Sequence, residues 1–176
     1  TIYAGNNSLL KKDAGQNATV TYQNCIYEVQ SGDFSQQTQD FIRLIPENAG
    51  NIFQITNYER RPEWDKTLND NEFRGTLEIR FLDGKLRIIN ELPIEDYLKG
   101  IAETSNTDPI EKMKAVIVTA RSYAYYYSNI CHKFPGKPYH LDDNPDHTQK
   151  YRGYGYEKRS PNAVKAVNVT QGIVVT

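Results

Sequence analysis

The chain has 176 residues, 38% of them hydrophobic and 24% charged, and a formal net charge of −1. This length fits one domain with room for a small second one, and the charge indicates no attraction to nucleic acid or to an anionic membrane. No apolar run reaches the length of a transmembrane helix, and the first residues do not resemble a signal peptide. If the protein is exported, we expect its signal or anchor to lie outside this sequence.

The N-terminal part, up to about residue 71, has the pattern of a β-rich segment. Apolar and polar residues alternate over 18–22 and 25–29, with Asn between them. We expect strands there and over 41–45 and 51–58, a loop or the tip of a hairpin over 31–39, and a loop over 60–70. Trp64 in the last loop has two open interpretations, a side chain that covers the core or an exposed ring that stacks on a sugar.

Residues 74–90 have the pattern of a β-hairpin. Asp83 and Gly84 suit a two-residue type I′ turn, in which both residues need positive φ. Counting outward from this turn places the apolar residues of both strands on one face. The predicted cross-strand pairs are Phe81 with Leu86 and Ile79 with Ile88.

Two helices are predicted after the hairpin. Pro93 suits the first position of a short helix, and Gly100 can end it in a left-handed conformation. A second helix is expected to begin with Asp108 as its N-cap and Pro109 at its first position. Glu111 lies three residues after that cap, as in a capping box.

The second helix, over 109–128, carries an apolar stripe at spacings of three and four residues, which predicts one buried face. Arg121 lies beside this stripe, so its guanidinium needs a partner or a water-filled cleft. The polar loop between the two helices contains one glutamate, Glu103. The stripe consists of Ile110, Met113, Ile117, Ala120, Ala124 and Tyr127.

The C-terminal part begins with a loop over 129–146, which is rich in Pro, Gly and Asp. A short helix is expected over 161–169 with Asn162 as its approximate cap, followed by a strand-like segment over 173–176. The whole pattern predicts an α+β fold, with a β-rich part over 1–72 packed with a part over 73–176. That second part centres on one long helix, flanked by hairpins and short helices.

Four runs resemble the stage II sporulation protein D family, also called the amidase-enhancer (LytB-type) domain. They read NELPIEDYLKGIAE, PIEKMKAVIVTARSYA, TQKYRG and AVKAVNVTQGIVV, and the resemblance covers 73–176. It implies peptidoglycan as substrate, an extracytoplasmic location at the cell envelope or surface and, for the sporulation members, lytic transglycosylase activity. Two departures stand out: the loop AETSNTD is about two residues shorter than in the family, and the chain stops before the family's Cys-Gly-Gly segment, so the domain is expected to be truncated.

The family's catalytic glutamate lies in the loop where Glu103 stands. The resemblance implies that Glu103 protonates the oxygen between N-acetylmuramic acid and N-acetylglucosamine and then takes the proton of the muramyl C6 hydroxyl, which closes a 1,6-anhydro ring. A glycoside hydrolase usually needs a second carboxylate. Within the loop only Asp108 remains, and it is expected to cap the next helix, but hydrolysis stays open because carboxylates occur elsewhere, at Glu95, Asp96, Asp142 and Asp143.

Two groups of residues near this glutamate in the motifs are candidate substrate contacts. Ser105 and Asn106 suit hydrogen bonds to sugar hydroxyl or acetamido groups, or else belong to a turn. Arg121, Ser122 and Tyr123 match the family's "ART/SYA" run. Arg121 is expected to orient Glu103 or to bind a substrate carboxylate, with a purely structural ion pair as the alternative.

The third candidate group matches the family's "Q-Y-G" run. Its members are Gln149, Tyr151 and Gly153, and the resemblance implies that this turn lies beside the cleft. Tyr151 is expected to stack on a sugar face. The alternative is that the turn only closes the fold.

Cofactors are not expected, with zinc as the alternative. Some family members are expected to hold a metal in the region of Cys131 and the histidines, but the spacing here fits no standard zinc pattern, and Thr148 stands where the family often has a cysteine. The sequence leaves three alternatives open for Cys25 and Cys131: a disulfide, two separate thiols, or a metal ligand. The histidines concerned are His132, His140 and His147.

Three functions therefore compete. The first is a lytic transglycosylase that acts through Glu103. The second is a non-catalytic cell-wall-binding enhancer of an N-acetylmuramoyl-L-alanine amidase, and the third is a structural surface domain. A semi-buried Glu103 in a cleft near Arg121 and Tyr151 would favour the enzyme, whereas a fully solvated Glu103 on a flat surface would favour the others.

Overall fold

The computed structural model describes residues 1–175. Its contacts divide the chain into two compact units: unit 1 comprises Thr1–Asn51 and Gly75–Glu91, and unit 2 comprises Ile52–Arg74 and Leu92–Thr176. This division differs from a single boundary after residue 72, because the hairpin groups with the N-terminal strands and residues 52–74 group with the C-terminal helices. Antiparallel sheets and helices both occur, which confirms the α+β class.

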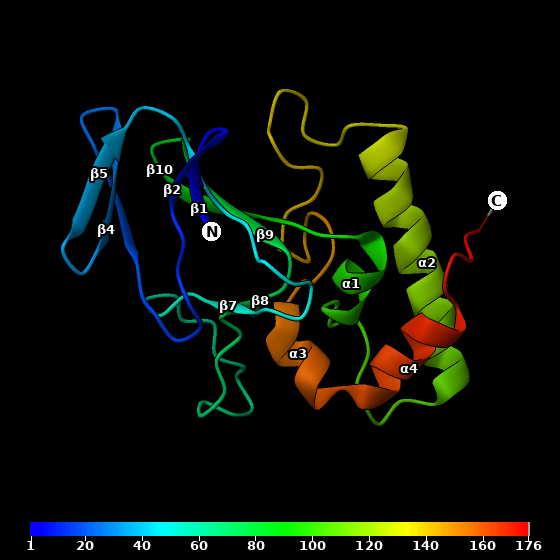
Figure 1. Ribbon diagram of the computed structural model, residues 1–176. Coiled ribbons are helices and arrows are strands. Elements are labelled where there is room, and N and C mark those ends of the chain that lie inside the picture. The colour runs from blue at the N-terminus through cyan, green and yellow to red at the C-terminus, as the bar shows by residue number, and fades with distance from the viewer. Residues whose placement is uncertain (176) are drawn as a thin grey trace. The chain divides into compact units, whose positions relative to one another are not determined.

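Unit 1 contains two antiparallel sheets (Figure 1). The five-stranded sheet has the order β10-β9-β6-β1-β2, and the three-stranded sheet has the order β3-β4-β5. Buried apolar side chains of both sheets form the core of this unit, with Val29 and Ile42 fully buried. The strands are β1 (Ile2–Ala4), β2 (Asn7–Leu10), β3 (Thr19–Gln23), β4 (Ile26–Ser31), β5 (Phe34–Thr38), β6 (Ile42–Leu44), β9 (Thr76–Leu82) and β10 (Lys85–Glu91).

The predicted hairpin is confirmed. Asp83 and Gly84 have φ of 53° and 78°, as a type I′ turn requires. The pairing has the predicted register, with Phe81 opposite Leu86 and Ile79 opposite Ile88. Residues 31–39 contain the tip of a hairpin, as one of the two alternatives predicted, because a short turn joins β4 to β5. The range does not form a loop throughout, since 34–38 is a strand. Its mostly exposed polar side chains do not show the apolar alternation of a strand.

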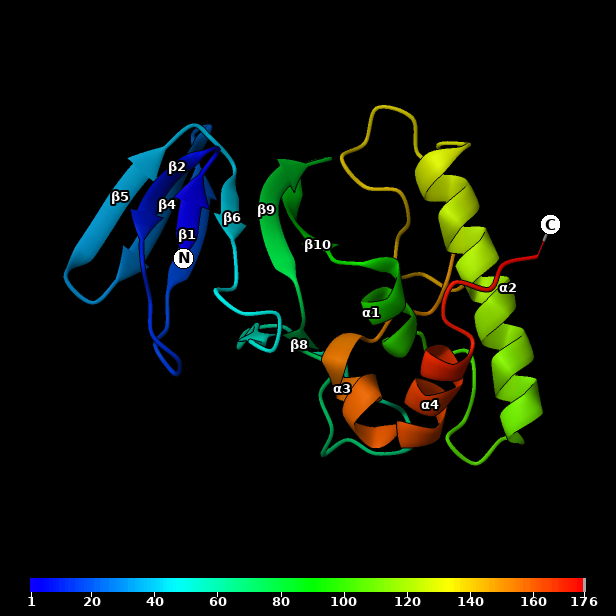
Figure 2. The ribbon, with the colours of Figure 1, turned by 45° about the vertical axis from the view of Figure 1, so that its right-hand side comes forward.

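Unit 2 consists of four helices and a two-stranded sheet (Figure 2). The helix α2 runs beside α1 and α4 in both ribbon views, and each pair is in contact. The expected loop over 60–70 is confirmed, whereas the strand expected over 51–58 shrinks to two residues. The elements are β7 (Phe53–Gln54), β8 (Glu72–Phe73), α1 (Ile94–Lys99), α2 (Ile110–Asn129), α3 (Gly153–Arg159) and α4 (Pro161–Val169).

The apolar stripe of α2 forms one side of the core of unit 2. Met113, Ile117, Ala120 and Ala124 are buried, as the periodicity predicted. They pack with side chains from α1, α4 and the segment after the 129–146 loop. The helix α3 was not predicted, because its two glycines favour a turn over a helix.

Several helix ends differ from the expectation. Gly100 has φ −91° and is right-handed, not left-handed as expected. A glycine is needed there because Tyr151 packs closely against it: a Cβ at Gly100 would lie 2.5 Å from Tyr151 Cε2. Asp108 does not cap α2, because its Oδ2 accepts a hydrogen bond from the Ser105 N–H and its Oδ1 one from Lys112. Pro109 takes the position before the helix without a side-chain cap.

The C-terminal end also differs from the expectation. The helix α4 covers the predicted residues, but Ser160 rather than Asn162 precedes it, with Pro161 at its first position. Ile173 to Val175 form no strand, and Thr176 lies outside the described residues. No helix within residues 1–175 combines the length and apolarity that crossing a membrane requires.

Candidate functional site

Glu103 follows a short antiparallel contact between two distant segments. Ile101 and Tyr151 form an isolated β-bridge. The Ala102 N–H donates to the Lys150 carbonyl oxygen at 2.8 Å, and the Arg152 N–H donates to the Gly100 carbonyl oxygen at 2.7 Å. The loop after α1 is therefore paired with the segment before α3, and Glu103 emerges beside Lys150.

The carboxylate of Glu103 is held at one oxygen. The Lys150 N–H donates to Oε1 at 2.7 Å, although the side chain as a whole is exposed. Among residues 1–175, Glu103 makes no other hydrogen bond or ion pair. A carboxylate held at one oxygen has a defined direction, and its second oxygen remains able to exchange a proton with a ligand.

Ser105 and Asn106 are engaged in the turn before α2. The Ser105 hydroxyl lies 2.9 Å from Thr107 Oγ1, and its N–H donates to Asp108. Asn106 accepts two hydrogen bonds from Asn162, one from its backbone N–H and one from its side chain, each 2.9 Å long. These contacts favour the turn alternative for both residues, with Ser105 the more exposed of the two.

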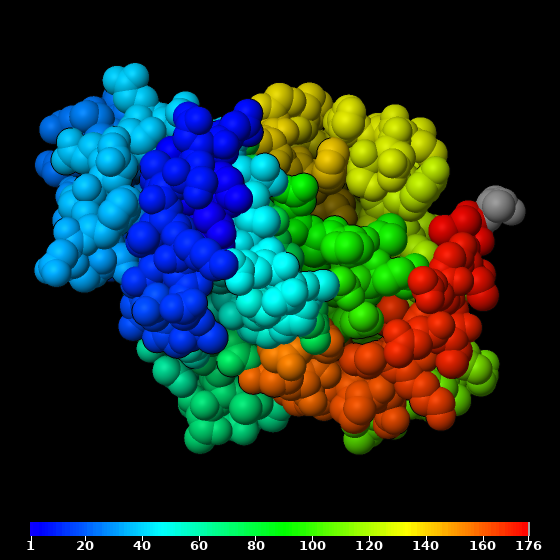
Figure 3. All heavy atoms as spheres, viewed as in Figure 1, coloured from blue at the N-terminus to red at the C-terminus, as the bar shows by residue number. Residues whose placement is uncertain are grey.

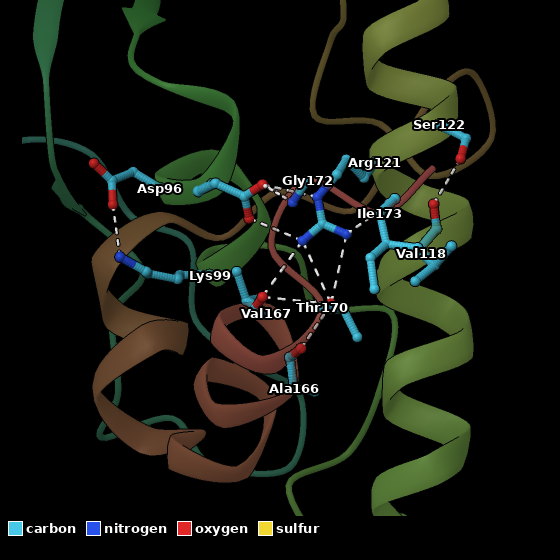
Figure 4. Close-up of polar contacts among 11 residues, drawn as sticks. Asp96, Lys99, Val118, Arg121, Ser122, Ala166, Val167, Thr170, Gly172 and Ile173 are labelled. Carbon is cyan, nitrogen blue, oxygen red and sulfur yellow. Dashed lines mark hydrogen bonds and ion pairs between the residues drawn. The ribbon is translucent and has the colours of Figure 1, made fainter. Parts of the chain in front are cut away.

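The Arg121 guanidinium is fully engaged by protein groups, and Glu103 is not among them (Figure 4). Its guanidinium is 2% exposed and forms a two-point ion pair with Glu95. It also donates to the Ile173 carbonyl oxygen at 3.0 Å, and it lies near the Thr170 hydroxyl and the Val167 carbonyl oxygen. The structure therefore favours the structural ion pair over an arginine that orients Glu103 or binds substrate.

Ser122 continues this network toward the C-terminus. Its hydroxyl donates to the Val118 carbonyl oxygen and accepts a hydrogen bond from the Val175 N–H, each at 2.8 Å. Arg121 and Ser122 together hold the segment after α4, which Figure 3 shows in red at the surface of unit 2. Neither residue is therefore placed to contact a glycan at Glu103.

Tyr123 lies on a different side of α2. Its hydroxyl accepts a hydrogen bond from Lys133 Nζ at 2.8 Å and lies 3.4 Å from the His147 carbonyl oxygen. Its ring meets the Tyr127 ring edge-on, with 4.7 Å between centroids. These contacts connect α2 to the 129–147 loop.

The "Q-Y-G" residues are buried rather than lining a surface. Gln149 is 7% exposed and bonds to the Tyr97 hydroxyl and the Ala120 carbonyl oxygen. Tyr151 stacks on Tyr97 within the core, with 5.1 Å between ring centroids, so its ring is not available to a sugar. Gly153 has φ +64°, and a Cβ there would lie 2.6 Å from the Glu72 carbonyl oxygen. The turn therefore closes the fold.

Two groups at this site were missed by sequence reasoning. The Lys150 N–H belongs to the backbone, which carries no side-chain signal. Tyr97 lies within the NELPIEDYLKGIAE run, and its burial beside Tyr151 was not apparent from one short helix. Burial, reinforced by the neighbouring Tyr151, raises the pKa of Tyr97, with smaller contributions from Tyr123, Glu103 and Asp142.

The remaining candidates concern metals and exposed aromatic rings. Cys25 and Cys131 are free and exposed, so they form no disulfide. Across the described residues, no three Cys, His, Asp or Glu side chains gather as a metal site would require; His147 instead bonds to Asp142. Trp64 is 73% exposed and does not cover the core, which leaves the sugar-stacking interpretation.

Comparisons with known proteins agree with the motifs. Residues 82–176 match the SpoIID family, described as stage II sporulation protein. A stretch of 108 residues, 60% of the chain, is 37% identical to an uncharacterised protein of Brachyspira hyodysenteriae. The match covers 28% of that relative, so the chain spans less than a third of its length. No solved structure matches the chain.

Proposed function

Because this chain belongs to the SpoIID family of stage II sporulation proteins, we propose that it cleaves the glycan strands of peptidoglycan as a lytic transglycosylase at the cell envelope. The bond cleaved joins N-acetylmuramic acid to N-acetylglucosamine. One observation carries this proposal: the only glutamate of the loop, Glu103, has one carboxylate oxygen fixed by the Lys150 N–H while the side chain stays open to a ligand.

The reaction needs one carboxyl group in two successive roles. Protonated Glu103 donates its proton to the glycosidic oxygen, and the bond from this oxygen to the muramyl C1 breaks with the electron pair leaving on the oxygen. The Glu103 carboxylate then accepts the proton of the muramyl C6 hydroxyl, whose oxygen bonds to C1. The products are a 1,6-anhydro-muramyl end, a free sugar hydroxyl and a Glu103 that is protonated again.

The Lys150 N–H supports this chemistry through orientation. A carboxyl group that is held in one direction does not need to be ordered at the moment of proton transfer. Since Oε1 is occupied by this bond, Oε2 is the oxygen that donates and accepts the proton.

The surroundings favour an internal nucleophile over hydrolysis, which usually requires a second carboxylate to activate water. Asp108, the other carboxylate of the loop, bonds to Ser105 and Lys112. The four alternatives considered from the sequence are also partnered: Glu95 by Arg121, Asp96 by Lys99, Asp142 by His147 and Asp143 by Arg60.

The test is digestion of purified peptidoglycan, intact and stripped of stem peptides, with products identified by mass spectrometry. We expect anhydro-muramyl ends from the wild type and a loss of about 10²- to 10⁴-fold in rate for Glu103→Gln. The matched control is Glu111→Gln, which changes an exposed glutamate of α2 that pairs with Lys114. Reducing ends from the wild type would establish hydrolysis instead.

A second function, a non-catalytic cell-wall-binding enhancer of an N-acetylmuramoyl-L-alanine amidase, is favoured by the exposure of Glu103 and the burial of Gln149 and Tyr151. An enhancer needs a surface that binds peptidoglycan, but it does not need a glutamate that transfers protons. It predicts that wild type and Glu103→Gln both bind peptidoglycan without cleaving it, and that both accelerate release of stem peptides by an added amidase.

A further inference from the structure

We propose that Gln149 is a positioning residue for Glu103, because its buried side chain fixes the segment that presents the Lys150 N–H to Glu103 Oε1. This inference rests on the proposed function, since it assigns Gln149 a part in the same reaction. It replaces the expectation that Gln149 contacts the glycan. Gln149 acts on Glu103 through the backbone amide of Lys150, whereas Glu103 itself contacts the substrate.

The side chain of Gln149 connects two helices. Its Nε2 donates to the Ala120 carbonyl oxygen of α2 at 3.3 Å, and its Oε1 accepts a hydrogen bond from the Tyr97 hydroxyl of α1 at 3.1 Å. Both ends of the amide are therefore used, and the side chain is almost without contact to solvent. A buried amide with a partner at each end has one orientation, because any rotation would leave buried polar groups unpaired.

Tyr97 is suited to hold this amide. Its ring stacks on Tyr151 at an angle of 22° between planes, and Tyr151 is two residues after Gln149. Burial raises the pKa of Tyr97, so its hydroxyl keeps its proton and remains a donor to Gln149 Oε1. Tyr97 thus fixes the segment at two points, through a hydrogen bond to residue 149 and through ring contact with residue 151.

The backbone transmits this anchoring to Glu103. Lys150 lies between the two anchored residues, and the Tyr151 N–H donates to the Gln149 carbonyl oxygen at 2.8 Å. The Lys150 carbonyl oxygen is bound by the Ala102 N–H, one residue before Glu103. The Lys150 N–H is therefore held in place on both sides, and it donates to Glu103 Oε1 at 2.7 Å.

Loss of this anchor should affect the chemical step and spare glycan binding. A displacement of about 1 Å in a reacting group can cost about 100-fold in rate. For soluble glycan strands we expect kcat to fall about 10- to 100-fold in Tyr97→Phe and Gln149→Leu, with KM within about twofold of the wild type, because neither side chain is placed to touch the glycan.

The variants are chosen to separate positioning from folding. Tyr97→Phe removes one hydroxyl and keeps the ring on Tyr151, and Gln149→Leu removes both amide hydrogen bonds at similar volume. Tyr125→Phe is the control, since it removes the hydroxyl of a tyrosine of α2 that is 50% exposed. If Gln149→Leu does not fold, Tyr97→Phe alone decides.

The second readout does not depend on cleavage. In ¹⁵N-labelled protein at one fixed pH, the Lys150 amide proton should resonate upfield in Glu103→Gln relative to the wild type, because its hydrogen bond to the carboxylate is lost. We expect Tyr97→Phe and Gln149→Leu to show at least half of this upfield shift, and Tyr125→Phe to show none.

Two results would overturn the positioning role. One is a Lys150 amide proton resonance in Tyr97→Phe at the same position as in the wild type. The other is a raised KM with unchanged kcat, which would mean that these side chains help to bind the glycan. A wild type that does not cleave glycan overturns the proposed function, whereas the amide resonance still decides whether Gln149 holds Lys150 against Glu103.

Discussion

Arg121 of α2 and Glu95 of α1 form a two-point ion pair inside unit 2, with Nε–Oε1 and Nη2–Oε2 distances of 2.9 Å and 2.8 Å. The same guanidinium donates to the Ile173 carbonyl oxygen, and Glu95 Oε1 also accepts a hydrogen bond from the Gly172 N–H. The guanidinium group is planar and has five N–H donors, so one arginine can bind a carboxylate and backbone carbonyl groups at the same time. This pair therefore ties two helices to the segment that follows α4.

Removal of Arg121 should destabilise the fold strongly. In Arg121→Ala, Glu95 would keep its place in the partly buried site without its counter-charge, and loss of one partner of a buried pair costs about 3–5 kcal/mol. We expect the free energy of unfolding, measured by urea denaturation, to fall by about that amount. The control is Lys112→Met, whose exposed pair with Asp108 should contribute at most about 1 kcal/mol.

An Arg121→Ala variant with unchanged stability but weaker binding to peptidoglycan would contradict the structural role. It would return Arg121 to the substrate contacts that the ARSYA motif suggested. The structural role predicts lower stability, and the substrate role predicts unchanged stability with weaker binding. Measuring both properties on one preparation of the variant therefore decides between them.

Glu95 should make stability depend on acid pH. Burial acts to raise its pKa, but the hydrogen bonds from Arg121 and Gly172 and the nearby charges of Arg121 and Lys99 lower it below the ordinary value of 4.5. A carboxyl group with a lowered pKa in the folded state contributes stability that is complete above its unfolded pKa and is lost as pH falls through the folded pKa.

The expected result concerns the difference between wild type and Glu95→Gln. The contributions of the other carboxylates are the same in both proteins and cancel in this difference. The difference in unfolding free energy should therefore be constant at neutral pH and shrink as pH falls below about 4.5. Chemical denaturation at a series of pH values measures it. A difference that grows toward acid pH would show that Glu95 is not stabilised in its charged form.

The hairpin and α2 were predictable because local pattern and tertiary structure agree there. Asp83 and Gly84 set the turn and the register, and the stripe that contains Met113 and Ile117 set the buried face of α2. The helix ends were less predictable. Asp108 had the right spacing for a cap, but its carboxylate binds Ser105 and Lys112, a choice between partners that the spacing does not reveal.

The candidate site was predictable only in part. Glu103 was singled out by motif resemblance, whereas the Lys150 N–H that binds it belongs to a segment 47 residues away. The need of Arg121 for a partner was evident from its position on the helix. Its choice of Glu95 over Glu103 depends on how α1 and α2 pack, and periodicity along one helix contains no information on that.

Gly100 should not tolerate a side chain. A Cβ at this position would lie 2.5 Å from Tyr151 Cε2 and 3.1 Å from the Gly153 Cα, and the Tyr151 ring is fixed in the core. We expect Gly100→Ala to lower the free energy of unfolding by about 1–3 kcal/mol, as overpacking does. Gly50→Ala is the control, because a Cβ there meets nothing within 4 Å. Equal stability of both variants would mean that Tyr151 can move at little cost.

Trp64 should matter for binding and not for stability. Its ring is 73% exposed in a loop of unit 2, so Trp64→Ala removes little buried surface, and the free energy of unfolding should change by no more than about 0.5 kcal/mol. An exposed indole can stack on a sugar face, so we expect the fraction of protein that sediments with purified peptidoglycan to fall. Trp64→Phe should restore part of this binding because it keeps an aromatic face. A lower stability in Trp64→Ala would contradict the exposed position, and unchanged sedimentation would exclude this ring from the glycan contacts.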